Sequence, residues 1–458
     1  MPAELDLRQP GRIHIVGIGG AGMSAIALVL SAMGHTVSGS DLKDSPVAER
    51  LRSHGIHVAV GHRAENVGQV DVVTYSPAVA LSNPEIRAAG ARGALVVPRS
   101  GTLAAICATR RCLAVAGTHG KTSTASMLSL ILVEAGLRPS FLIGSDVNEI
   151  GTNAVWDQGE YLVVEADESY GTFQAIRPDL AVLTNVEPDH LDYYGTFERL
   201  QDAFSEFVGS ATEGSIVSAD DAQASAIGRT HGSTSVGRAI DARYVIGDIE
   251  EERSAIAFTL NGPDGVLGEI RLGVPGLWNA SNAALATVAA LRVGAPFSAA
   301  QSALARFVGV SRRFEFRGEA HGVTFVDDYA HLPGEVRAVL ATAKAGGWDR
   351  IVAVFQPHRF GRTAQLAPDF GTAFADADVL VVTDIYSAGE APVPGVSGRL
   401  VVDAVRERDP RLEVHYVPGW EELRRSVGEL LRPGDLCFTL GAGDLTLLPD
   451  QLIESPQW

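Results

Sequence analysis

The sequence has 458 residues, of which 46% are hydrophobic and 20% charged, as is typical of a globular protein with two to four domains. Its formal net charge of −18 argues against a protein that binds the nucleic-acid backbone. The N-terminus lacks the apolar segment of a signal peptide, and no apolar run approaches the roughly 18 residues of a membrane span. We therefore expect a cytoplasmic protein without membrane insertion, whose cysteines (Cys107, Cys112 and Cys437) are plain reduced thiols.

The first predicted unit begins with a short apolar strand at 12–16. It runs into the glycine cluster Gly17-Ile18-Gly19-Gly20-Ala21-Gly22, a helix that ends near Gly34, and a second strand that ends at Asp41. This pattern is typical of a βαβ unit in which a diphosphate approaches the glycine turn and the acid reaches a ribose hydroxyl. A nicotinamide-dependent oxidoreductase would look the same, and a purely structural glycine turn also fits. We predict a Rossmann-like domain over 1–107.

A second strand–loop–helix pattern follows at residues 113–135. The strand leads into a glycine-rich loop with the sequence Gly117-Thr118-His119-Gly120-Lys121-Thr122-Ser123. Backbone N–H groups of such a loop hold phosphates, the lysine neutralises the charge that develops on transfer, and the threonine can bind Mg²⁺. The loop departs from the usual Walker pattern because Val115 takes the place of the first glycine. We predict a P-loop ATPase-like central domain over 108–310.

Acidic segments follow two buried strands of this central domain. Glu165-Ala166-Asp167-Glu168-Ser169 ends the strand at 161–165, and Asn185-Val186-Glu187-Pro188-Asp189-His190-Leu191-Asp192 follows the strand at 180–184. Carboxylates at the ends of buried strands are costly without a cation, and Mg²⁺ favours carboxylate and phosphate oxygens. Beside a phosphate loop, these segments predict a metal site. Two other stretches, 228–237 and 261–265, are predicted to be surface hairpins or loops.

The strand–helix alternation restarts near residue 312 and predicts a Rossmann-like C-terminal domain over 311–458. Its expected strands lie at 323–326, 351–355, 379–383 and 436–440. Polar segments accompany them: Arg312-Arg313-Phe314-Glu315, Asp327-Asp328-Tyr329-Ala330-His331 and Gln356-Pro357-His358-Arg359-Phe360-Gly361-Arg362-Thr363. Arg359 and Arg362 share one face at this spacing, which suits a carboxylate or phosphate. The fold class is therefore α/β, with three α/β domains in series.

Together these segments resemble the Mur ligases, most closely the branch that adds L-alanine, over essentially the whole chain. The residues that carry the resemblance are Val16–Ser24, Ser38–Asp41, Gly117–Ser123, Glu165–Ser169, Thr184–His190, Arg312–Glu315, Asp327–His331, Phe355–Arg359 and Gly441–Asp444. The resemblance implies an ATP- and Mg²⁺-dependent ligase that joins L-alanine to the lactyl carboxylate of UDP-N-acetylmuramate through an acyl phosphate. It places this reaction in peptidoglycan precursor synthesis and implies that the N-terminal domain binds a UDP-sugar instead of NAD.

The resemblance also implies roles for single residues. Gly19, Gly22, Ser40 and Asp41 would line the UDP site, with His62 near the uridine. Residues Gly117, Thr118, His119, Gly120, Lys121, Thr122 and Ser123 would bind the ATP phosphates, and Thr122, Glu165 and His190 would hold magnesium. Asn279 and Asn282 would contact adenine, Asp328 the ribose and Arg313 the γ-phosphate. His331, His358, Arg359 and Arg362 would face the amino acid and the acyl phosphate.

The sequence departs from the family pattern at a few positions. Tyr170 stands where an aspartate is usual, Trp278 and Leu332 where histidines are usual, and Gly101 where an acid is common. A divergent paralogue that uses another amino acid or a peptide therefore remains an alternative, as does a nucleotide-binding regulatory protein. Lys121 is the only lysine of the central domain, so none is left to be carbamylated as in sister ligases, which agrees with the alanine-adding branch. We expect a monomer or homodimer with a hinge near Gly309–Ser311.

Overall fold

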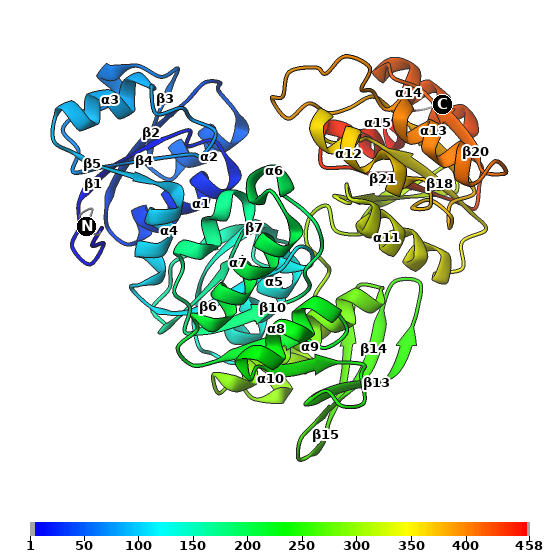
Figure 1. Cartoon of the computed structure of the whole chain (residues 1–458), viewed down its shortest axis with the longest axis horizontal. Helices are drawn as coiled ribbons and strands as arrows, with labels where there is room; N and C mark the ends of the chain where they lie inside the picture. Colours follow the sequence, from blue (N-terminus) through cyan, green and yellow to red (C-terminus); the bar gives the residue numbers. More distant parts are fainter. Residues whose placement is uncertain (1–4, 456–458) are drawn as a thin grey trace. The chain divides into compact units, whose positions relative to one another are not determined.

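The computed structural model describes residues 5–455, which form two compact units (Figure 1). The first unit comprises the chain up to Ile249 together with Ala257–Arg271 and Trp278–Phe307. The second comprises Glu250–Ile256, Leu272–Leu277 and the chain from Val308 onward. No helix in the described part of the chain is long and apolar enough to cross a membrane.

The N-terminal sheet of the first unit is fully parallel, with the strand order β3-β2-β1-β4-β5. Its strands are β1 (Arg12–Val16), β2 (Thr36–Asp41), β3 (His57–Val60), β4 (Val72–Tyr75) and β5 (Leu95–Pro98). Its helices are α1 (Ala21–Ala32), α2 (Pro46–Ser53), η1 (Ala64–Asn66), α3 (Pro84–Ala91) and α4 (Arg99–Cys107). The glycine turn lies between β1 and α1, so the predicted βαβ unit is confirmed.

The central sheet has ten strands in the order β15-β14-β13-β12-β11-β10-β6-β9-β7-β8. The strands are β6 (Arg111–Ala116), β7 (Ser140–Val147), β8 (Thr152–Val155), β9 (Tyr161–Glu165), β10 (Leu180–Leu183), β11 (Ser215–Ser218), β12 (Thr234–Gly237), β13 (Tyr244–Glu251), β14 (Ile256–Gly262) and β15 (Gly265–Leu272). The helices are α5 (Lys121–Glu134), η2 (Ser169–Ala175), α6 (Leu191–Tyr194), α7 (Phe197–Gly209), α8 (Ala222–His231), α9 (Leu277–Arg292) and α10 (Phe297–Ala305). β6 lies between β9 and β10, so the carboxyl ends of all three strands meet at one edge.

One of the two predicted surface loops is wrong. The stretch 228–237 contains the end of α8 and all of β12, which pairs in parallel with β11. The short sequence Thr234-Ser235-Val236-Gly237 has one large apolar residue, so its pattern resembles that of a loop. The stretch 261–265 does contain the turn between β14 and β15.

The second unit contains a six-stranded sheet in the order β16-β17-β21-β18-β19-β20. The strands are β16 (Glu315–Ala320), β17 (Val323–Asp328), β18 (Arg350–Phe355), β19 (Val379–Val382), β20 (Glu413–Tyr416) and β21 (Asp435–Leu440). The helices are α11 (Pro333–Ala345), α12 (Phe360–Phe370), α13 (Arg399–Arg408), α14 (Trp420–Leu430), η3 (Asp444–Leu447) and α15 (Leu448–Ile453). β16 pairs antiparallel with β17, and the other strands pair in parallel. Three α/β domains therefore follow one another along the chain.

A single hydrophobic core joins the two sheets of the first unit. It runs from Ile13 and Leu30 of the N-terminal sheet to Leu162 and Phe204 of the central one, all of which are buried. α1 packs against β7 and β8. The N-terminal lobe, which contains the sheet β1–β5, and the central lobe, which contains the ten-stranded sheet, therefore share apolar surface. This common core holds the glycine turn and the phosphate loop within one unit.

Candidate functional site

The phosphate loop connects β6 to α5 and has a backbone that only glycine allows. At Gly117, with φ +136°, an added Cβ would lie 2.1 Å from Thr184 Oγ1. At Gly120, with φ +78°, it would lie 2.5 Å from Asn282 Oδ1. Asn282 of α9, predicted to contact adenine, thus lies at the loop, and Asn279 lies one turn earlier on the same helix. The loop ends at the N-terminus of α5, where backbone N–H groups favour an anion.

Lys121 is anchored at the rim of this loop. Its Nζ donates to the carbonyl oxygens of Gly117 at 2.6 Å and Thr118 at 3.1 Å, and it lies 2.8 Å from a carboxylate oxygen of Glu168. Burial alone would lower the pKa of Lys121, but the carboxylates nearby, above all that of Glu168, raise it. Burial raises the pKa of Glu168 itself to about 7. The lysine is therefore charged and held where phosphate would bind.

Oxygen ligands gather at the ends of β9 and β10. The Thr122 hydroxyl donates to Glu165 Oε1 at 3.0 Å, and the Gly144 N–H donates to Glu165 Oε2 at 2.7 Å. Ligand atoms of Glu168, Asp189 and His190 lie within 4.8 Å of one another. Carboxylates, a hydroxyl and an imidazole in this density fit a divalent cation such as Mg²⁺.

The predicted metal residues Thr122 and Glu165 contact each other, and the predicted His190 groups with Glu168 and Asp189, which were not predicted. Both lie inside the acidic segments from which the sequence predicts a metal site. In a segment with several acids, however, the sequence does not reveal which side chains point toward one another. His190 adopts φ +52°, a conformation that is strained for a residue other than glycine. That geometry places its Nε2 at 3.1 Å from Ser169 Oγ, in the other acidic segment.

The glycine turn of the N-terminal lobe is held by Asp41 and lies beside Arg99. The Gly19 N–H donates to Asp41 Oδ2 at 2.8 Å, and a Cβ at Gly22 would lie 3.0 Å from Arg99 Nη1. Arg99 also binds Asp167 of the central lobe at 3.2 Å. A single arginine therefore links the predicted UDP-sugar turn to the acidic segment after β9.

Ser40 and His62, both predicted for the UDP site, form one hydrogen-bonded pair. Ser40 Oγ lies 2.9 Å from His62 Nδ1, and Ser40 is fully buried. Its hydroxyl also donates to Glu85, a buried carboxylate that the sequence had not marked. The Ser40 hydroxyl, predicted to line the UDP site, is thus hydrogen-bonded to both His62 and Glu85.

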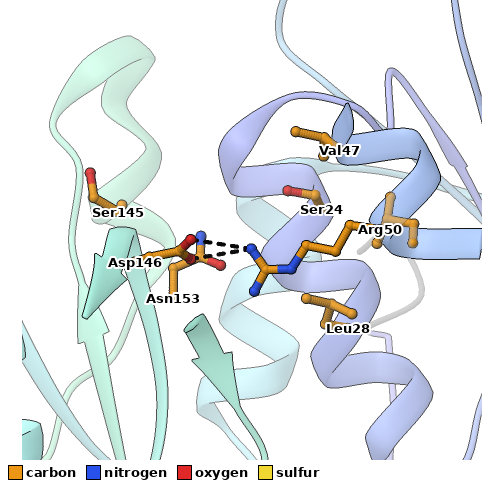
Figure 2. Close-up of a pocket in the computed structure, with 9 residues that line it drawn as sticks. Ser24, Leu28, Val47, Arg50, Ser145, Asp146 and Asn153 are labelled. Carbon is orange, nitrogen blue, oxygen red and sulfur yellow. Dashed lines mark hydrogen bonds and ion pairs between the residues drawn. The ribbon is translucent and has the colours of Figure 1, made fainter. Parts of the chain in front are cut away.

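A cavity of about 210 Å³ lies between the two lobes of the first unit. Figure 2 shows Ser24, Leu28, Val47 and Arg50 of α1 and α2 facing Ser145, Asp146 and Asn153 of β7 and β8. Arg50 Nη1 lies 3.2 Å from Asp146 Oδ2 and bridges the two walls. Gly144, whose N–H donates to Glu165, also lines the cavity.

In the second unit, Asp328 and Arg313 lie at the carboxyl end of β17. Asp328 accepts backbone N–H groups from Phe314 and Ala330, both at 2.7 Å, and burial raises its pKa to about 7. The Arg313 guanidinium lies 5.2 Å from the centre of the Tyr329 ring and 3.8 Å from Glu335. The two residues predicted to bind the nucleotide thus lie close together, Asp328 at the end of β17 and Arg313 in the loop that precedes β16.

The histidines and arginines of the second unit form a tight group. The rings of His331 and His358 lie 5.5 Å apart, and His358 stacks on Tyr386 at 5.8 Å. Arg362 Nη1 lies 3.0 Å from His358 Nδ1. Burial and the nearby positive charges lower the pKa of His358 to about 3. A guanidinium only donates, so neutral His358 accepts at Nδ1 and carries its proton on Nε2.

Arg359 lies beside this group at the start of α12, with φ +70°. Its Nε is buried and finds no hydrogen-bond partner within residues 5–455. A buried guanidinium nitrogen without an acceptor fits an anionic ligand.

The structure shows the surroundings of all four residues that depart from the family pattern. Leu332 is buried at the start of α11, so it packs in the core. Tyr170 is about half exposed and contacts Tyr193 edge-on at 6.2 Å. A Cβ at Gly101 would lie 2.6 Å from Val97, so an acid there would require Val97 to move. Trp278, at the start of α9, is partly exposed.

The site residues therefore form two sets, one in each unit. The first unit brings together Gly117–Ser123, Glu165, Glu168, His190 and Asn282, with Gly19, Gly22 and Asp41 linked to them through Arg99. The second unit brings together Arg313, Asp328, His331, His358, Arg359 and Arg362.

Comparison with known proteins gives matches in all three domains. Residues 12–111 match the Mur ligase family catalytic domain, 115–290 the Mur ligase middle domain, and 312–443 the Mur ligase glutamate ligase domain. The UDP-N-acetylmuramate–L-alanine ligase of Anaeromyxobacter sp. (strain Fw109-5) is 44% identical, with 97% of this chain and 98% of that protein covered. The ligase of the same name from Saccharopolyspora erythraea is 45% identical, with 96% and 92% covered.

Solved structures of Mur ligases and related ligases also resemble this chain. The crystal structure of UDP-N-acetylmuramate–alanine ligase MurC from Thermotoga maritima superposes with a TM-score of 0.83 at 29% identity and covers 97% of this chain and 98% of that one. A murein peptide ligase from Psychrobacter arcticus, 24% identical with a TM-score of 0.71, shares the fold. The chain belongs to the Mur ligase family.

Proposed function

We propose that this chain is an ATP-dependent ligase that joins L-alanine to the lactyl carboxylate of UDP-N-acetylmuramate, a step of peptidoglycan precursor synthesis. The observation that carries the proposal is the arrangement of Lys121 and Thr122 against Glu165 and Glu168, which suits phosphoryl transfer with a divalent cation. The relatives named as L-alanine ligases match over nearly the whole chain and supply the choice of substrates.

The proposed reaction has two steps. The γ-phosphoryl group of ATP is transferred to the lactyl carboxylate, which gives an acyl phosphate and ADP. The amine of L-alanine then attacks the acyl carbon, the C–O bond to phosphate breaks, and the amine loses a proton as the amide forms. ATP, carboxylate and amine thus become ADP, phosphate and amide.

The residues of the first unit suit the first step. The N-terminus of α5 and Lys121 would hold the phosphates and stabilise the negative charge that spreads during transfer. Thr122, Glu165, Glu168, Asp189 and His190 would hold Mg²⁺. When bound, Mg²⁺ neutralises charge on the phosphate oxygens. Gly144 would keep Glu165 oriented, because its N–H occupies one carboxylate oxygen.

The residues of the second unit suit an anionic intermediate and an incoming amino acid. The buried Nε of Arg359 offers a donor to a phosphate or carboxylate oxygen. His358, with its proton on Nε2, offers a second donor without a net charge. Arg313 and Asp328 would bind the γ-phosphate and the ribose of ATP.

The test is release of inorganic phosphate by the purified enzyme with ATP, Mg²⁺ and UDP-N-acetylmuramate. We expect release to depend on L-alanine, and mass spectrometry to show the alanyl product. The same assay is repeated with other amino acids and peptides, and release that requires one of these would instead establish a divergent paralogue. Absence of release with every amine would overturn the proposal.

A further inference from the structure

The turn between β13 and β14 belongs to the second unit, although both strands are part of the central sheet. The first unit includes β13 as far as Ile249 and resumes in β14 at Ala257. The residues between them, Glu250–Ile256, pack with the C-terminal domain, and we call this segment the strap. The strap therefore connects the central sheet to the C-terminal domain at a point that is remote in sequence from the linker at 308–311.

Arg253 fixes the strap to the C-terminal end of α11. Its Nε donates to the carbonyl oxygen of Gly346 at 2.9 Å, and its Nη2 donates to that of Gly347 at 2.8 Å. Gly346 caps α11, and Gly347 has φ +68°, a left-handed conformation that is common where a helix ends. Carbonyl groups at the end of a helix lack partners within it and carry the negative end of its dipole. A guanidinium suits this place, since it offers a positive charge and a rigid pair of donors.

Trp348 provides a further contact for the same guanidinium. The Cζ atom of Arg253 lies 4.4 Å from the centre of the Trp348 ring, where the face of the ring attracts a cation. Arg253 lies in an exposed turn, so solvent alone would leave its long side chain free to change rotamer. Two hydrogen bonds and one aromatic face instead hold it at a single place on the C-terminal domain.

The backbone of β13 is irregular just before the strap. Asp248 has φ +43°, a left-handed conformation that costs free energy in a residue other than glycine. Its carboxylate accepts the hydroxyl of Thr259 in β14 at 2.9 Å, and Gly247 precedes it. Irregularities of this kind interrupt a strand and change its direction. The chain therefore passes from the first unit into the strap at an irregular point, where a change of angle disturbs little regular structure.

The linker between the units holds the opposite end of α11. Arg313, which follows the linker, lies 3.8 Å from Glu335 in the first turn of this helix. A Cβ added at Gly309 would lie 3.3 Å from Val274, so the segment Leu272–Leu277, which also belongs to the second unit, packs on the linker. α11 has 13 residues, and an α-helix of that length spans about 20 Å. The strap and the linker are therefore attached about one helix length apart.

We propose that the strap, clamped by Arg253, is a second attachment that confines the movement of the second unit to rotation about a line roughly parallel to α11. A body held at one point can turn in any direction, whereas a body held at two separated points can rotate only about the line that joins them. The inference rests on the proposed function for its purpose, since that reaction needs the site residues of both units together. Fewer orientations then have to be searched before the two sets meet.

Hydrogen exchange of the full chain, followed by mass spectrometry of its peptides, tests the clamp without any ligand. In Arg253→Ala, we expect amide hydrogens of the strap and of the last turn of α11 to exchange at least about tenfold faster than in the wild type. Arg253→Lys keeps the charge over Trp348 but lacks the rigid fork, so its exchange should lie between the two. Arg243→Ala, which removes an exposed arginine just before β13, should match the wild type. Unchanged exchange in Arg253→Ala would overturn the clamp.

The distance between two spin labels, measured by pulsed electron paramagnetic resonance, tests the confinement. The three cysteines of the chain are buried, so labels react selectively at the exposed positions Thr230→Cys in α8 and Glu429→Cys in α14, one on each unit. We expect a narrow distribution of distances in the chain that retains Arg253, and loss of that narrow distribution when Arg253→Ala is added. Equally narrow distributions in both would overturn the proposal.

Turnover separates the strap from the proposed function. We expect L-alanine-dependent phosphate release by Arg253→Ala to fall by about 3- to 10-fold, because the assembled state is reached less often, and release by Arg243→Ala to stay normal. A wild type without turnover on any amine would overturn the proposed function, while exchange and label distances would still decide the strap. Full turnover in Arg253→Ala, despite a broadened distribution, would overturn the role of the strap in the reaction and leave the proposed function intact.

Discussion

Lys121 Nζ lies 2.8 Å from a carboxylate oxygen of Glu168, a residue of the acidic segment that follows β9. The same ammonium donates to the Gly117 carbonyl oxygen at 2.6 Å. The pair brings the end of the phosphate loop and the metal-ligand cluster to one point. Any phosphate held by the loop would therefore lie beside a fixed cation and close to the groups suited to Mg²⁺.

Replacement of this lysine should abolish the reaction. Lys121→Ala removes a charge that acts mainly on the phosphoryl group in transfer, so we expect kcat to fall by at least about 100-fold. L-Alanine-dependent phosphate release measures the effect. Unchanged turnover would contradict the assignment of the loop.

Lys344→Ala provides the matched control. Lys344 is about half exposed on α11, and its Nζ lies 3.9 Å from Asp378, so it is an ordinary surface lysine. We expect normal turnover from this variant.

The hydroxyl of Thr122 should matter for magnesium affinity. Thr122→Val keeps the size of the side chain but removes both the donor to Glu165 and an oxygen ligand. We expect the Mg²⁺ concentration for half-maximal activity to rise by about 10- to 100-fold, as is usual when a group that orients a metal ligand is lost. Thr122→Ser, which keeps the hydroxyl, should remain near wild type. Equal magnesium dependence in all three proteins would show that Thr122 plays no part in the metal site.

The low pKa of His358 predicts a dependence of stability on pH. The folded pKa of His358, about 3, lies below its ordinary value of 6.5, so between these values the unfolded chain binds a proton that the folded chain does not. Stability is therefore lost as the pH falls through this range, by about 2 kcal/mol at pH 5. His358→Asn, whose Oδ1 can replace Nδ1 as the acceptor from Arg362, should lack this loss. Urea unfolding at pH 7.5 and pH 5 measures the difference, and identical pH dependence in the two proteins would contradict a neutral buried His358.

The Arg50–Asp146 bridge across the cavity of Figure 2 should contribute little to stability. The two side chains are 37% and 44% exposed, and ion pairs of this exposure usually contribute about 0.2–1 kcal/mol. A double-mutant cycle with Arg50→Ala and Asp146→Ala, read by urea unfolding, should give a coupling free energy in that range. A coupling above about 2 kcal/mol would mean that the bridge is a principal link between the lobes. The shared core of the first unit makes that outcome unexpected.

Elements with a buried apolar run were predictable from the sequence. β18, whose sequence Ile351-Val352-Ala353-Val354-Phe355 is wholly buried, stands out at once. β16 and β20, at the two edges of the same sheet, were not predicted, because Glu315-Phe316-Arg317-Gly318-Glu319-Ala320 and Glu413-Val414-His415-Tyr416 carry exposed polar residues. Edge strands bury fewer side chains, so their composition resembles that of loops.

The candidate site residues divide in the same way. Some belong to a contiguous sequence motif, and others come together only in the folded chain. The strand–loop–helix that carries Lys121 and Thr122 was predictable because such a loop is a contiguous motif with its own backbone conformation. Glu85 was not, because Asn83-Pro84-Glu85 reads as the ordinary start of a helix with an exposed acid in its first turn. Its burial depends on β2 and η1, which reach it only in the folded chain.

The measurement that tests the account most directly follows an oxygen atom of the substrate. The lactyl carboxylate of UDP-N-acetylmuramate is labelled with ¹⁸O, and the inorganic phosphate released in the presence of ATP and L-alanine is analysed by mass spectrometry. If the site activates the carboxylate as an acyl phosphate, each phosphate released carries one carboxylate oxygen. Phosphate without the label, formed at the same rate as the amide, would contradict carboxylate phosphorylation at this site.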